Sequence, residues 1–364
     1  MEWKEDVLGN VLEVKYGKDH KKLADGQYPV YGSGGLMRYV DSILYDGPSI
    51  LIPRKGTLNN IMFVDSPFWT VDTMFWSIIN TDKVDPKFLF YSICKRDFAS
   101  MNVGSAVPSM TVNILNDIQI SYPKNISDQR RIASILSSLD QKIELNNRIN
   151  ADLEKMAQAI FKNWFVDFEP FKNGKFVDSE LGMIPEGWKV GSLGDFCNVF
   201  TGKKNTSQAI EKGLYPFFSC APEPLASNDA IFNGKAIIIA GNGSYTGRTS
   251  FYNGEFDLYQ RTYACTIREQ DKENLMIFFY HMMKQFFEPT KMGGTRGSSI
   301  PYIVMGDITQ QKFPYSKDWL IRFSNIANSM MDRKLRIDKE NSRLSLLRDT
   351  LLPRLMSGEL EVPE

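Results

Sequence analysis

The sequence predicts an α+β fold built as a tandem repeat, in which two similar globular halves each end in a long helix. Two observations lead to this prediction. Short motifs of the first half recur in the same order in the second half, and a seven-residue hydrophobic repeat follows each half. The 364 residues, of which 43% are hydrophobic and 12% aromatic, allow two or three domains with sizeable cores.

The repeat extends over both halves. EWKEDVLGNV near the start matches GWKVGSLGDF, and YGK then matches TGK at Gly17 and Gly202. Further on, SILIPRKGTLNN matches AIIIAGNGSYTG, GSAVP matches GSSIP, and Asp117 is matched with Asp307. The spacing between matches drifts, as expected of divergent copies whose loops vary in length.

Two long helices are predicted, over residues 128 to about 165 and from about 319 to 355, because hydrophobic residues recur there every seven positions. At 1.5 Å per residue each helix would span roughly 50–55 Å. Since one small domain cannot cover that length, we expect the two helices to pack on each other. Asn146, Asn150 and Asn341 interrupt the hydrophobic series, and buried asparagines of this kind set the register of packed helices.

The first long helix shows the pattern most clearly. Ser127 and Asp128 are predicted to form its N-cap. Its hydrophobic positions are Ile132, Leu139, Leu153 and Ile160 in one series and Leu136, Ile143, Ala157 and Trp164 in the other.

Charge, cysteine content and the N-terminus narrow the classes of function. Basic and acidic residues balance at 43 each, which counts mildly against a nucleic-acid binder. The four cysteines are scattered and only His20 and His281 are present, so we expect neither a zinc site nor a Cys/His nucleophile. The sequence lacks a run of about 18 apolar residues, and MEWKEDVLGN is too polar for a signal peptide. We therefore expect a cytoplasmic protein.

The segment KAIIIAGNGSYTGR, residues 235–248, raises the alternative of a nucleotide site. A strand followed by Gly-x-Gly lets the backbone approach a phosphate, but a helix should come next. Here TSFYNGEFDLY follows, which is typical of another strand. The matching segment PRKGTLNN lacks the glycine pair. We interpret both segments as variable recognition loops on a repeated scaffold.

The connector IFKNWFVDFEPF…SELGMIPEGW, the helix start DQRRIASILSSLDQKIE and the ending LRDTLLPRLMSGEL resemble the specificity (S) subunits of type I restriction-modification enzymes. The GSAVP and GSSIP loops fit as well, and the resemblance covers essentially the whole chain. It implies two tandem target recognition domains of mixed, largely β structure. It also implies that two long helices separate them as an antiparallel coiled coil, which relates the halves by a pseudo-twofold axis.

Four regions follow from this resemblance. We expect target recognition domain 1 at residues 1–126, the first spacer helix and the connector at 127–187, target recognition domain 2 at 188–316, and the second spacer helix with a C-terminal tail at 317–364.

The resemblance also implies what the chain does. Such subunits are not catalytic; they recognise a bipartite DNA site and dock two methyltransferase (M) subunits and, optionally, two restriction (R) subunits. We expect no cofactor in this chain, with S-adenosylmethionine, ATP and Mg²⁺ on the partner subunits. Because the loops of the two halves differ strongly, the DNA target is expected to be asymmetric and interrupted.

Candidate DNA-binding residues lie in three pairs of matching loops and in the segment Gln260-Arg261-Thr262. Arg, Lys, Asn, Ser and Thr side chains on loops are the groups that contact bases and phosphates. The candidates are Lys18, Lys21, Lys22, Arg54, Lys55, Thr57, Asn59, Asn60, Ser105, Lys203, Lys204, Asn242, Ser244, Tyr245, Thr246, Arg248, Arg261, Thr295, Arg296 and Ser298.

The main rival from another class is an enzyme, a stand-alone methyltransferase or nuclease, and two further alternatives stay open. A methyltransferase would need an Asn/Asp-Pro-Pro-Tyr/Phe motif, yet the sequence has no Pro-Pro pair, and a Walker A motif is also missing. A protein-binding scaffold with two interaction globules and no intrinsic DNA specificity is compatible with zero net charge. The aromatic residues Trp164, Phe165 and Phe168 either face the M subunits or pack inside the connector.

Overall fold

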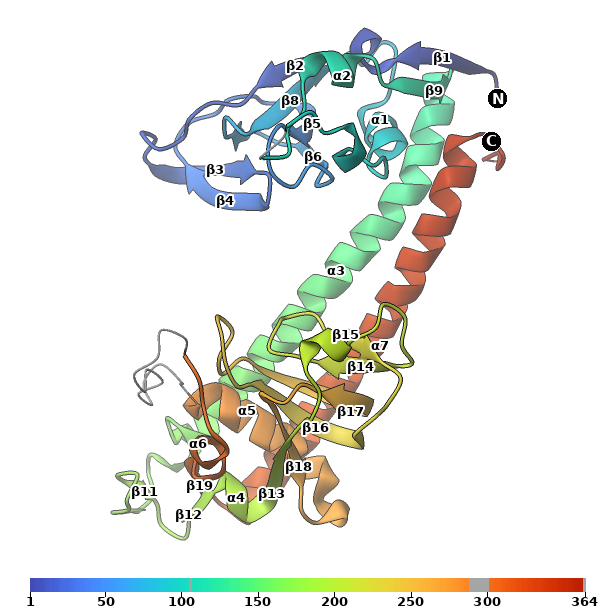
Figure 1. The fold of residues 1–364 in the computed structure, drawn as a ribbon. Coiled ribbons are helices and arrows are strands. Elements are labelled where there is room, and N and C mark those ends of the chain that lie inside the picture. Colours follow the sequence, from blue (N-terminus) through green and yellow to red (C-terminus); the bar gives the residue numbers. More distant parts are fainter. Residues whose placement is uncertain (105–106, 288–300, 363–364) are drawn as a thin grey trace. The chain divides into compact units, whose positions relative to one another are not determined.

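The computed structural model describes the protein over residues 1–104, 107–287 and 301–362. The chain forms two compact units, of which unit 1 comprises Met1–Asn146 and Lys339–Glu364 and unit 2 comprises Asn147–Asp338. Each unit contains a β-rich domain and a segment of each of two 40-residue helices, α3 (Ile126–Phe165) and α7 (Lys317–Met356) (Figure 1). The predicted α+β fold class with two long helices is confirmed.

The strands of unit 1 are β1 (Trp3–Val7), β2 (Leu12–Tyr16), β3 (Asp25–Gly32), β4 (Gly35–Val40), β5 (Pro48–Pro53), β6 (Met62–Asp65), β7 (Trp69–Thr70), β8 (Met74–Ile79) and β9 (Gln119–Pro123). Its short helices are α1 (Pro86–Ile93) and α2 (Val112–Asn116), with 3₁₀ turns at Leu8–Asn10 and Ala99–Met101. One sheet has the order β2-β8-β5-β6 and is antiparallel; another has the order β4-β3-β7, with β3 and β7 parallel; β1 pairs with β9.

The core of unit 1 lies between the antiparallel sheet, α1 and the two long helices. Residues 49–53 of β5 are buried, as expected of a central apolar strand. Asp85 caps α1 by accepting a 3.0 Å hydrogen bond from the Phe88 N–H, which directs Phe88 into the core. Leu136 of α3 and Leu352 of α7 complete the same cluster. The domain therefore buries its apolar face against both helices.

The strands of unit 2 are β10 (Phe176–Val177), β11 (Ile184–Pro185), β12 (Lys189–Ser192), β13 (Cys197–Thr201), β14 (Tyr215–Phe218), β15 (Leu225–Ser227), β16 (Phe232–Ala240), β17 (Thr249–Leu258), β18 (Thr262–Ile267) and β19 (Lys312–Tyr315). Its shorter helices are α4 (Leu193–Phe196), α5 (Met276–Phe286) and α6 (Met305–Thr309), with 3₁₀ turns at Glu169–Phe171, Thr206–Gln208 and Gln270–Leu275. The main sheet has the order β13-β18-β16-β17-β14-β15, β12 pairs with β19, and β10 pairs with β11.

Aromatic side chains dominate the core of unit 2. The rings of Phe161 and Phe165 on α3 stack with centroids 5.0 Å apart, and Phe165 also meets Phe278 of α5 and Phe323 of α7. Trp188, at the end of the connector, lies 5.5 Å from the Phe165 ring. Large aromatic surfaces contribute most to core burial. This cluster therefore holds the end of α3 against both α5 and α7.

The connector aromatics pack inside unit 2. Phe165 is buried, and Phe168 lies against Trp188 with ring centroids 5.3 Å apart. Trp164 meets Trp319 edge-on at 4.9 Å. Of the two alternatives that the sequence left open, the structure shows packing in the connector.

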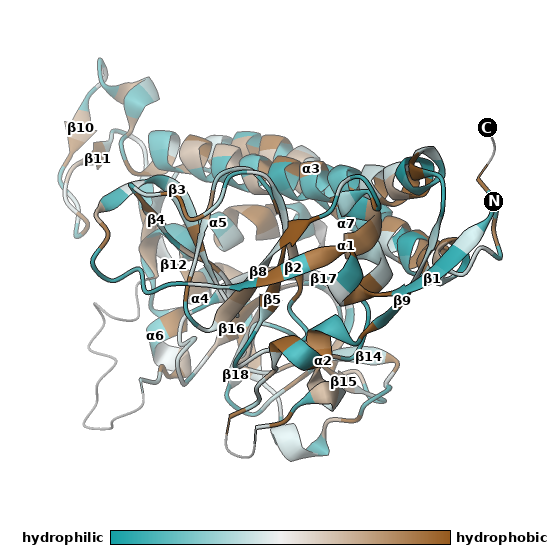
Figure 2. Ribbon diagram, turned by 90° about the horizontal axis from the view of Figure 1, so that it is seen from above, coloured by the Kyte–Doolittle hydropathy of each residue, from teal (hydrophilic) through white to brown (hydrophobic). Residues whose placement is uncertain are grey.

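The two long helices run antiparallel in each unit. In unit 1 the start of α3, with Ile132, packs near the end of α7, with Leu355. In unit 2 the later part of α3, with Ala157, packs near the start of α7, with Ala327 and Met331. Along its length α3 alternates between hydrophobic and hydrophilic colours (Figure 2). Of the predicted seven-residue series, Ile132, Leu136 and Ala157 lie in core clusters that also contain residues of α7.

The two asparagines that interrupt this pattern in α3, Asn146 and Asn150, are buried and hydrogen-bonded to α7. In unit 1, Asn146 Nδ2 donates to Asn341 Oδ1 at 2.8 Å and to Glu340 Oε2 at 2.9 Å. In unit 2, Asn150 Nδ2 donates to Asp338 Oδ1 at 2.6 Å. Each bond joins α3 to α7, so a slide of one helix along the other would leave buried amides unpaired.

Two details of the sequence prediction are wrong. The helix α3 begins at Ile126, because Asn125 rather than Ser127 or Asp128 is the N-cap; its Oδ1 accepts from the Ser127 N–H at 2.9 Å. The match of Asp117 with Asp307 also fails. Asp117 ends α2 as its C-cap, whereas Asp307 sits in the first turn of α6. An Asp-Ile pair occurs in both halves, but at different positions relative to the two short helices.

Unit 2 contains a buried histidine whose titration predicts a pH effect. His281 Nδ1 lies 2.9 Å from Gln158 Oε1 of α3, and burial lowers the pKa of His281 to about 4. In the unfolded chain a histidine takes up its proton near pH 6.5. The contribution of neutral His281 to stability is therefore complete above about pH 6.5 and is lost as the pH falls toward 4.

We expect the free energy of unfolding of unit 2 to fall by about 2 kcal/mol from this group between pH 7 and pH 5. Denaturant unfolding followed by fluorescence at the two pH values measures it. His281→Asn should remove this part of the pH dependence while keeping an amide near Gln158. An unchanged pH dependence in the variant would contradict the assignment.

Candidate nucleic-acid interface

In unit 1 three predicted loops contact one another. The Gly56 N–H donates to Pro108 O at 3.1 Å, and the Met110 N–H donates to Arg54 O at 2.9 Å. The Arg54 guanidinium carbon lies 5.7 Å from the centre of the Tyr16 ring, which joins the loop after β2 to the loop after β5. We call this group loop cluster 1, which comprises residues 16–22, 54–60, 104 and 107–110.

Unit 2 repeats this arrangement. The Gly243 N–H donates to Pro301 O at 3.1 Å, and the Ile303 N–H donates to Gly241 O at 2.9 Å. These two bonds join the same repeat positions as the two in unit 1. The Gly241 N–H donates in turn to Arg261 O at 2.9 Å. We call this group loop cluster 2, which comprises residues 202–205, 241–248, 259–262 and 301–303.

Each cluster contains a glycine, Gly17 or Gly202, that lies directly against the backbone at the end of a neighbouring strand. A Cβ added to Gly17 would lie 2.0 Å from the Val71 carbonyl oxygen, and one added to Gly202 would lie 1.7 Å from the Leu258 carbonyl oxygen. A side chain cannot fit at either position. This explains why YGK and TGK match in the two halves.

Lys204, a predicted DNA contact, forms ion pairs within unit 2. Its Nζ lies 2.7 Å from Asp229 Oδ2 and 2.6 Å from Asp257 Oδ2. The hydrogen bond to Asp229, followed by the one to Asp257, raises the pKa of Lys204. The Lys204 backbone O accepts from the Gln260 N–H at 2.9 Å. Lys204 thus fixes its loop beside residues 259–262, and its contact with DNA stays a prediction.

Two predicted arginines are held similarly. Arg248 Nη1 donates to Pro222 O at 2.9 Å, and its guanidinium lies 5.8 Å from the Tyr245 ring centre. Arg54 Nε donates to Asp72 O at 3.0 Å. Each arginine keeps further N–H donors beyond these bonds. Both can therefore order a loop and still meet a phosphate or a base.

The remaining predicted cations are exposed. They lie in both clusters, where lysine and arginine can neutralise phosphates. They are Lys18, Lys21, Lys22, Lys55, Lys203 and Arg261.

The predicted polar residues divide into two groups. Those that support the loops include Asn60, whose Nδ2 donates to Ser33 O at 2.8 Å, and Thr246, whose Oγ1 donates to Pro301 O at 3.0 Å. Asn59 accepts from the Ala99 N–H at 2.8 Å, and Asn242 Oδ1 lies 3.0 Å from Cys220 Sγ. Thr57, Ser244 and Tyr245 are exposed, and so is Asn59. The candidates that lie outside the described residues are Ser105, Thr295, Arg296 and Ser298.

Sequence reasoning missed the β3–β4 hairpin, which adjoins loop cluster 1. Its tip is tied to that cluster by the Asn60–Ser33 bond, and Arg38 Nη2 donates to Leu23 O at 2.9 Å. Met37 and Tyr39 are 56% and 50% exposed, which is unusual for large apolar side chains. The alternation in VYGSGGLMRYV could have predicted the hairpin, but not the exposure of Met37 and Tyr39, which share one face of β4.

The nucleotide alternative is excluded by the path of the chain. The loop after β16 leads directly into β17, which pairs antiparallel with β16, with Ile237 opposite Phe251. The phosphate-binding geometry requires a helix at that place. In the described ranges, no group of His, Cys, Asp and Glu side chains is arranged to hold a metal ion. Among the same residues, no helix combines the length and the apolar character that a membrane span requires.

Comparison with known proteins identifies the repeated unit. Residues 1–155 and 185–317 match the family described as Type I restriction modification DNA specificity domain. The Type I restriction enzyme MjaIX specificity subunit of Methanocaldococcus jannaschii is 28% identical, over 94% of this chain and 86% of that protein. The Type I restriction enzyme EcoDI specificity subunit of Escherichia coli is 33% identical over 49% of this chain and 40% of its own.

A solved structure shares the fold. The S subunit of a type I restriction-modification system from M. genitalium superposes with a TM-score of 0.65 at 18% identity, over 98% of this chain and 96% of that one. Both halves of the repeat fall in the family match, and the match covers most of the sequence. The chain therefore belongs to the type I restriction-modification DNA specificity family.

Proposed function

We propose that this chain is the DNA-specificity subunit of a type I restriction-modification complex and that each unit recognises one half of a bipartite target. The observation that carries the proposal is the recurrence of one loop arrangement in both units of a chain from this family. The two loop clusters share their backbone bonds and differ in their side chains. Unlike loops recognise unlike bases, so the target is asymmetric.

In this proposal the catalytic activities belong to partner subunits. The chain itself acts without catalysis, and two M subunits and, where present, two R subunits carry S-adenosylmethionine, ATP and Mg²⁺. The relatives that support this role are named specificity subunits. With zero net charge, the isolated chain gains little nonspecific affinity for DNA, and the M subunits supply much of the positive surface.

The test is co-expression with the M subunit, followed by mapping of N6-methyladenine in the host DNA. We expect the two proteins to co-purify and methylation to appear at one asymmetric, interrupted motif. If the chain neither binds that subunit nor changes the methylation pattern, the proposal is wrong. The two units would then be better explained as protein-binding modules without DNA specificity.

Matched variants connect the function to the loops. Lys18→Ala and Lys203→Ala occupy the same repeat position in the two clusters. With the purified complex, each should lower methylation at subsaturating DNA and reduce the salt slope of binding by about one unit. Lys155→Ala, an exposed lysine on α3, serves as the control and should leave both quantities unchanged.

A further inference from the structure

A second repeated motif lies in the helices that join each domain to the long helices. FYSICK, at the end of α1, matches FYHMMK in α5, so that Tyr91 corresponds to Tyr280 and Lys95 to Lys284. Both tyrosines are 5% exposed, although each carries a polar hydroxyl. A buried tyrosine hydroxyl needs a partner. In both units the partner is a carboxylate on α3.

In unit 1 the Tyr91 hydroxyl donates to Asp140 Oδ2 at 2.6 Å. Arg348 of α7 donates to the other oxygen, Asp140 Oδ1, at 2.8 Å. Lys95 Nζ lies 3.2 Å from Asp349 Oδ1, the residue next to Arg348 on α7. The domain is thus hydrogen-bonded to α3 and ion-paired to α7 at one level of the helix pair.

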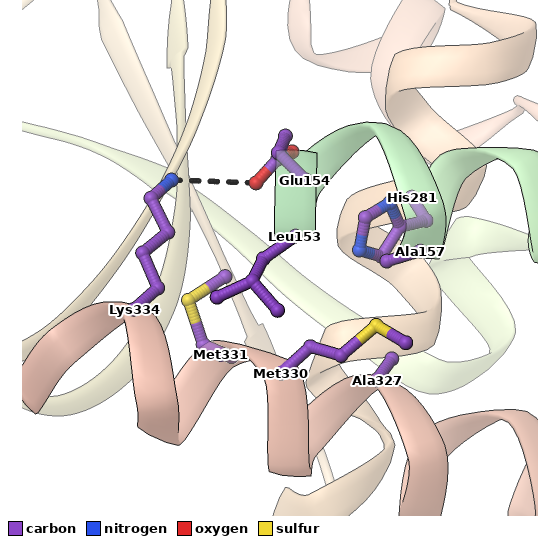
Figure 3. A pocket seen from close by; sticks show the side chains of 8 residues that line it. All are labelled: Leu153, Glu154, Ala157, His281, Ala327, Met330, Met331 and Lys334. Atoms are coloured by element: carbon purple, nitrogen blue, oxygen red, sulfur yellow. Dashed lines mark hydrogen bonds and ion pairs between the residues drawn. The ribbon is translucent and has the colours of Figure 1, made fainter. Parts of the chain in front are cut away.

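In unit 2 the Tyr280 hydroxyl donates to Glu154 Oε1 at 2.8 Å, and Lys284 Nζ lies 2.8 Å from the same oxygen. Lys334 of α7 lies 3.3 Å from Glu154 Oε2 (Figure 3). Burial opposes the ionisation of Glu154, but the Lys284 hydrogen bond and the charge of Lys334 outweigh it and bring its pKa down to about 2. The carboxylate is therefore charged at neutral pH.

We infer that these two groups are positioning clamps that fix each recognition domain in one register on the helix pair and so set the spacer length that the protein accepts between its DNA half-sites. Clamp 1 consists of Tyr91, Asp140 and Arg348, and clamp 2 consists of Tyr280, Glu154 and Lys334. The consequence for spacer length rests on the proposed function.

The argument rests on the directionality of the hydrogen bonds and on the burial of the groups that form them. Apolar packing alone tolerates small rotations of a domain on a helix, whereas a hydrogen bond between a rigid phenol and a carboxylate does not. Slippage by one helical turn moves the contacts by about 5.4 Å. It would leave a half-buried carboxylate and a buried hydroxyl without partners, which is costly.

One base pair added to the DNA spacer displaces a half-site by about 3.4 Å and rotates it by about a tenth of a turn. The protein can discriminate against a spacer of the wrong length only if each recognition domain is held rigidly on the helix pair.

The experiment uses the complex of the full chain with its M subunit. Methylation rates are measured on duplexes with the native spacer and with spacers one base pair longer and shorter. Tyr91→Phe and Tyr280→Phe remove only the hydroxyl of each clamp. We expect each variant to lower the ratio of the native rate to the altered-spacer rate by at least about fivefold. The double variant should lower it further.

Tyr122→Phe is the matched control. Tyr122 is also buried and its hydroxyl also donates to a carboxylate, Asp6 Oδ2 at 3.0 Å, but both residues lie in the β1–β9 pair. Its melting temperature should fall as in the clamp variants while its spacer ratio stays at the wild-type value. If all three variants lose stability alike and none changes the ratio, the clamps are merely structural and the inference is overturned.

A second readout separates this inference from the proposed function. In the isolated chain, hydrogen–deuterium exchange in α1 and in the α3 segment around Asp140 should be about fivefold faster in Tyr91→Phe than in Tyr122→Phe. Equal exchange in the two variants also overturns the clamp. If the wild-type complex methylates no bipartite motif, the proposed function fails, and the exchange measurement still decides whether the clamp holds the domain.

Discussion

Gly202→Ala is expected to destabilise unit 2 by at least about 3 kcal/mol, because the new Cβ would lie 1.7 Å from the Leu258 carbonyl oxygen and 2.3 Å from its carbonyl carbon. Backbone atoms cannot move aside as a flexible side chain can. The end of β13 would separate from the end of β17, and loop cluster 2 would lose its shape. Gly17→Ala should do the same in unit 1, where the Val71 carbonyl oxygen is 2.0 Å from the added Cβ.

Chemical denaturation of the two variants measures both effects. Gly34→Ala and Gly306→Ala are the controls for units 1 and 2. A Cβ added at Gly34 meets nothing within 4 Å, and one added at Gly306 meets only the end of the Gln310 side chain at 4.0 Å. Both controls should stay within about 1 kcal/mol of the native chain. Equal stability of Gly202→Ala and Gly306→Ala would show that the loop relaxes more easily than this geometry implies.

Phe165→Ala is expected to cost about 3–5 kcal/mol, the second large effect. The ring is buried among Trp188, Phe278 and Phe323, so its removal opens a cavity where α3, α5 and α7 meet. The loss should appear in the isolated chain, with no partner subunit present. That outcome distinguishes a core residue from a docking residue, whose loss would be seen only in complex formation.

Met156→Ala on the same helix provides the comparison. Met156 is 52% exposed, and we expect its replacement to change the free energy of unfolding by less than about 1 kcal/mol. If Phe165→Ala were as mild as Met156→Ala, the aromatic cluster would not be the main stabilising contact at the end of α3.

The long helices could be predicted from the sequence because their signal is local and periodic. Every seventh residue of α3 is hydrophobic, and Asn146 and Asn150 stand out against that series. The helix start was harder to predict, since Asn125 and Ser127 are both good caps and only the backbone path selects one. The Asp117 match failed for a related reason. Two identical residues are weak evidence that two positions are equivalent, and the order of the secondary structure elements is stronger evidence.

The repeat predicted which loops form the two clusters. It did not predict which of their side chains are ion-paired within the protein. Lys203 and Lys204 are adjacent and equivalent in the sequence, yet Asp257, far away in the chain, pairs with only one of them. Tyr91 and Tyr280 escaped notice because each lies within an apolar helix, where an aromatic residue is typical of a core. Their carboxylate partners lie on α3, and the sequence does not indicate which acid on a long helix meets which tyrosine.

The two units differ in how their sequence is arranged, and this bears on biosynthesis. Unit 2 is one continuous segment, Asn147–Asp338, whereas unit 1 joins the first 146 residues to the last 26. On the ribosome, the apolar face that meets Leu352 and Leu355 must therefore stay uncovered until residues 339–364 have been made, by which time unit 2 is complete. A chain that stops at residue 338 should accordingly keep unit 2 folded and destabilise unit 1.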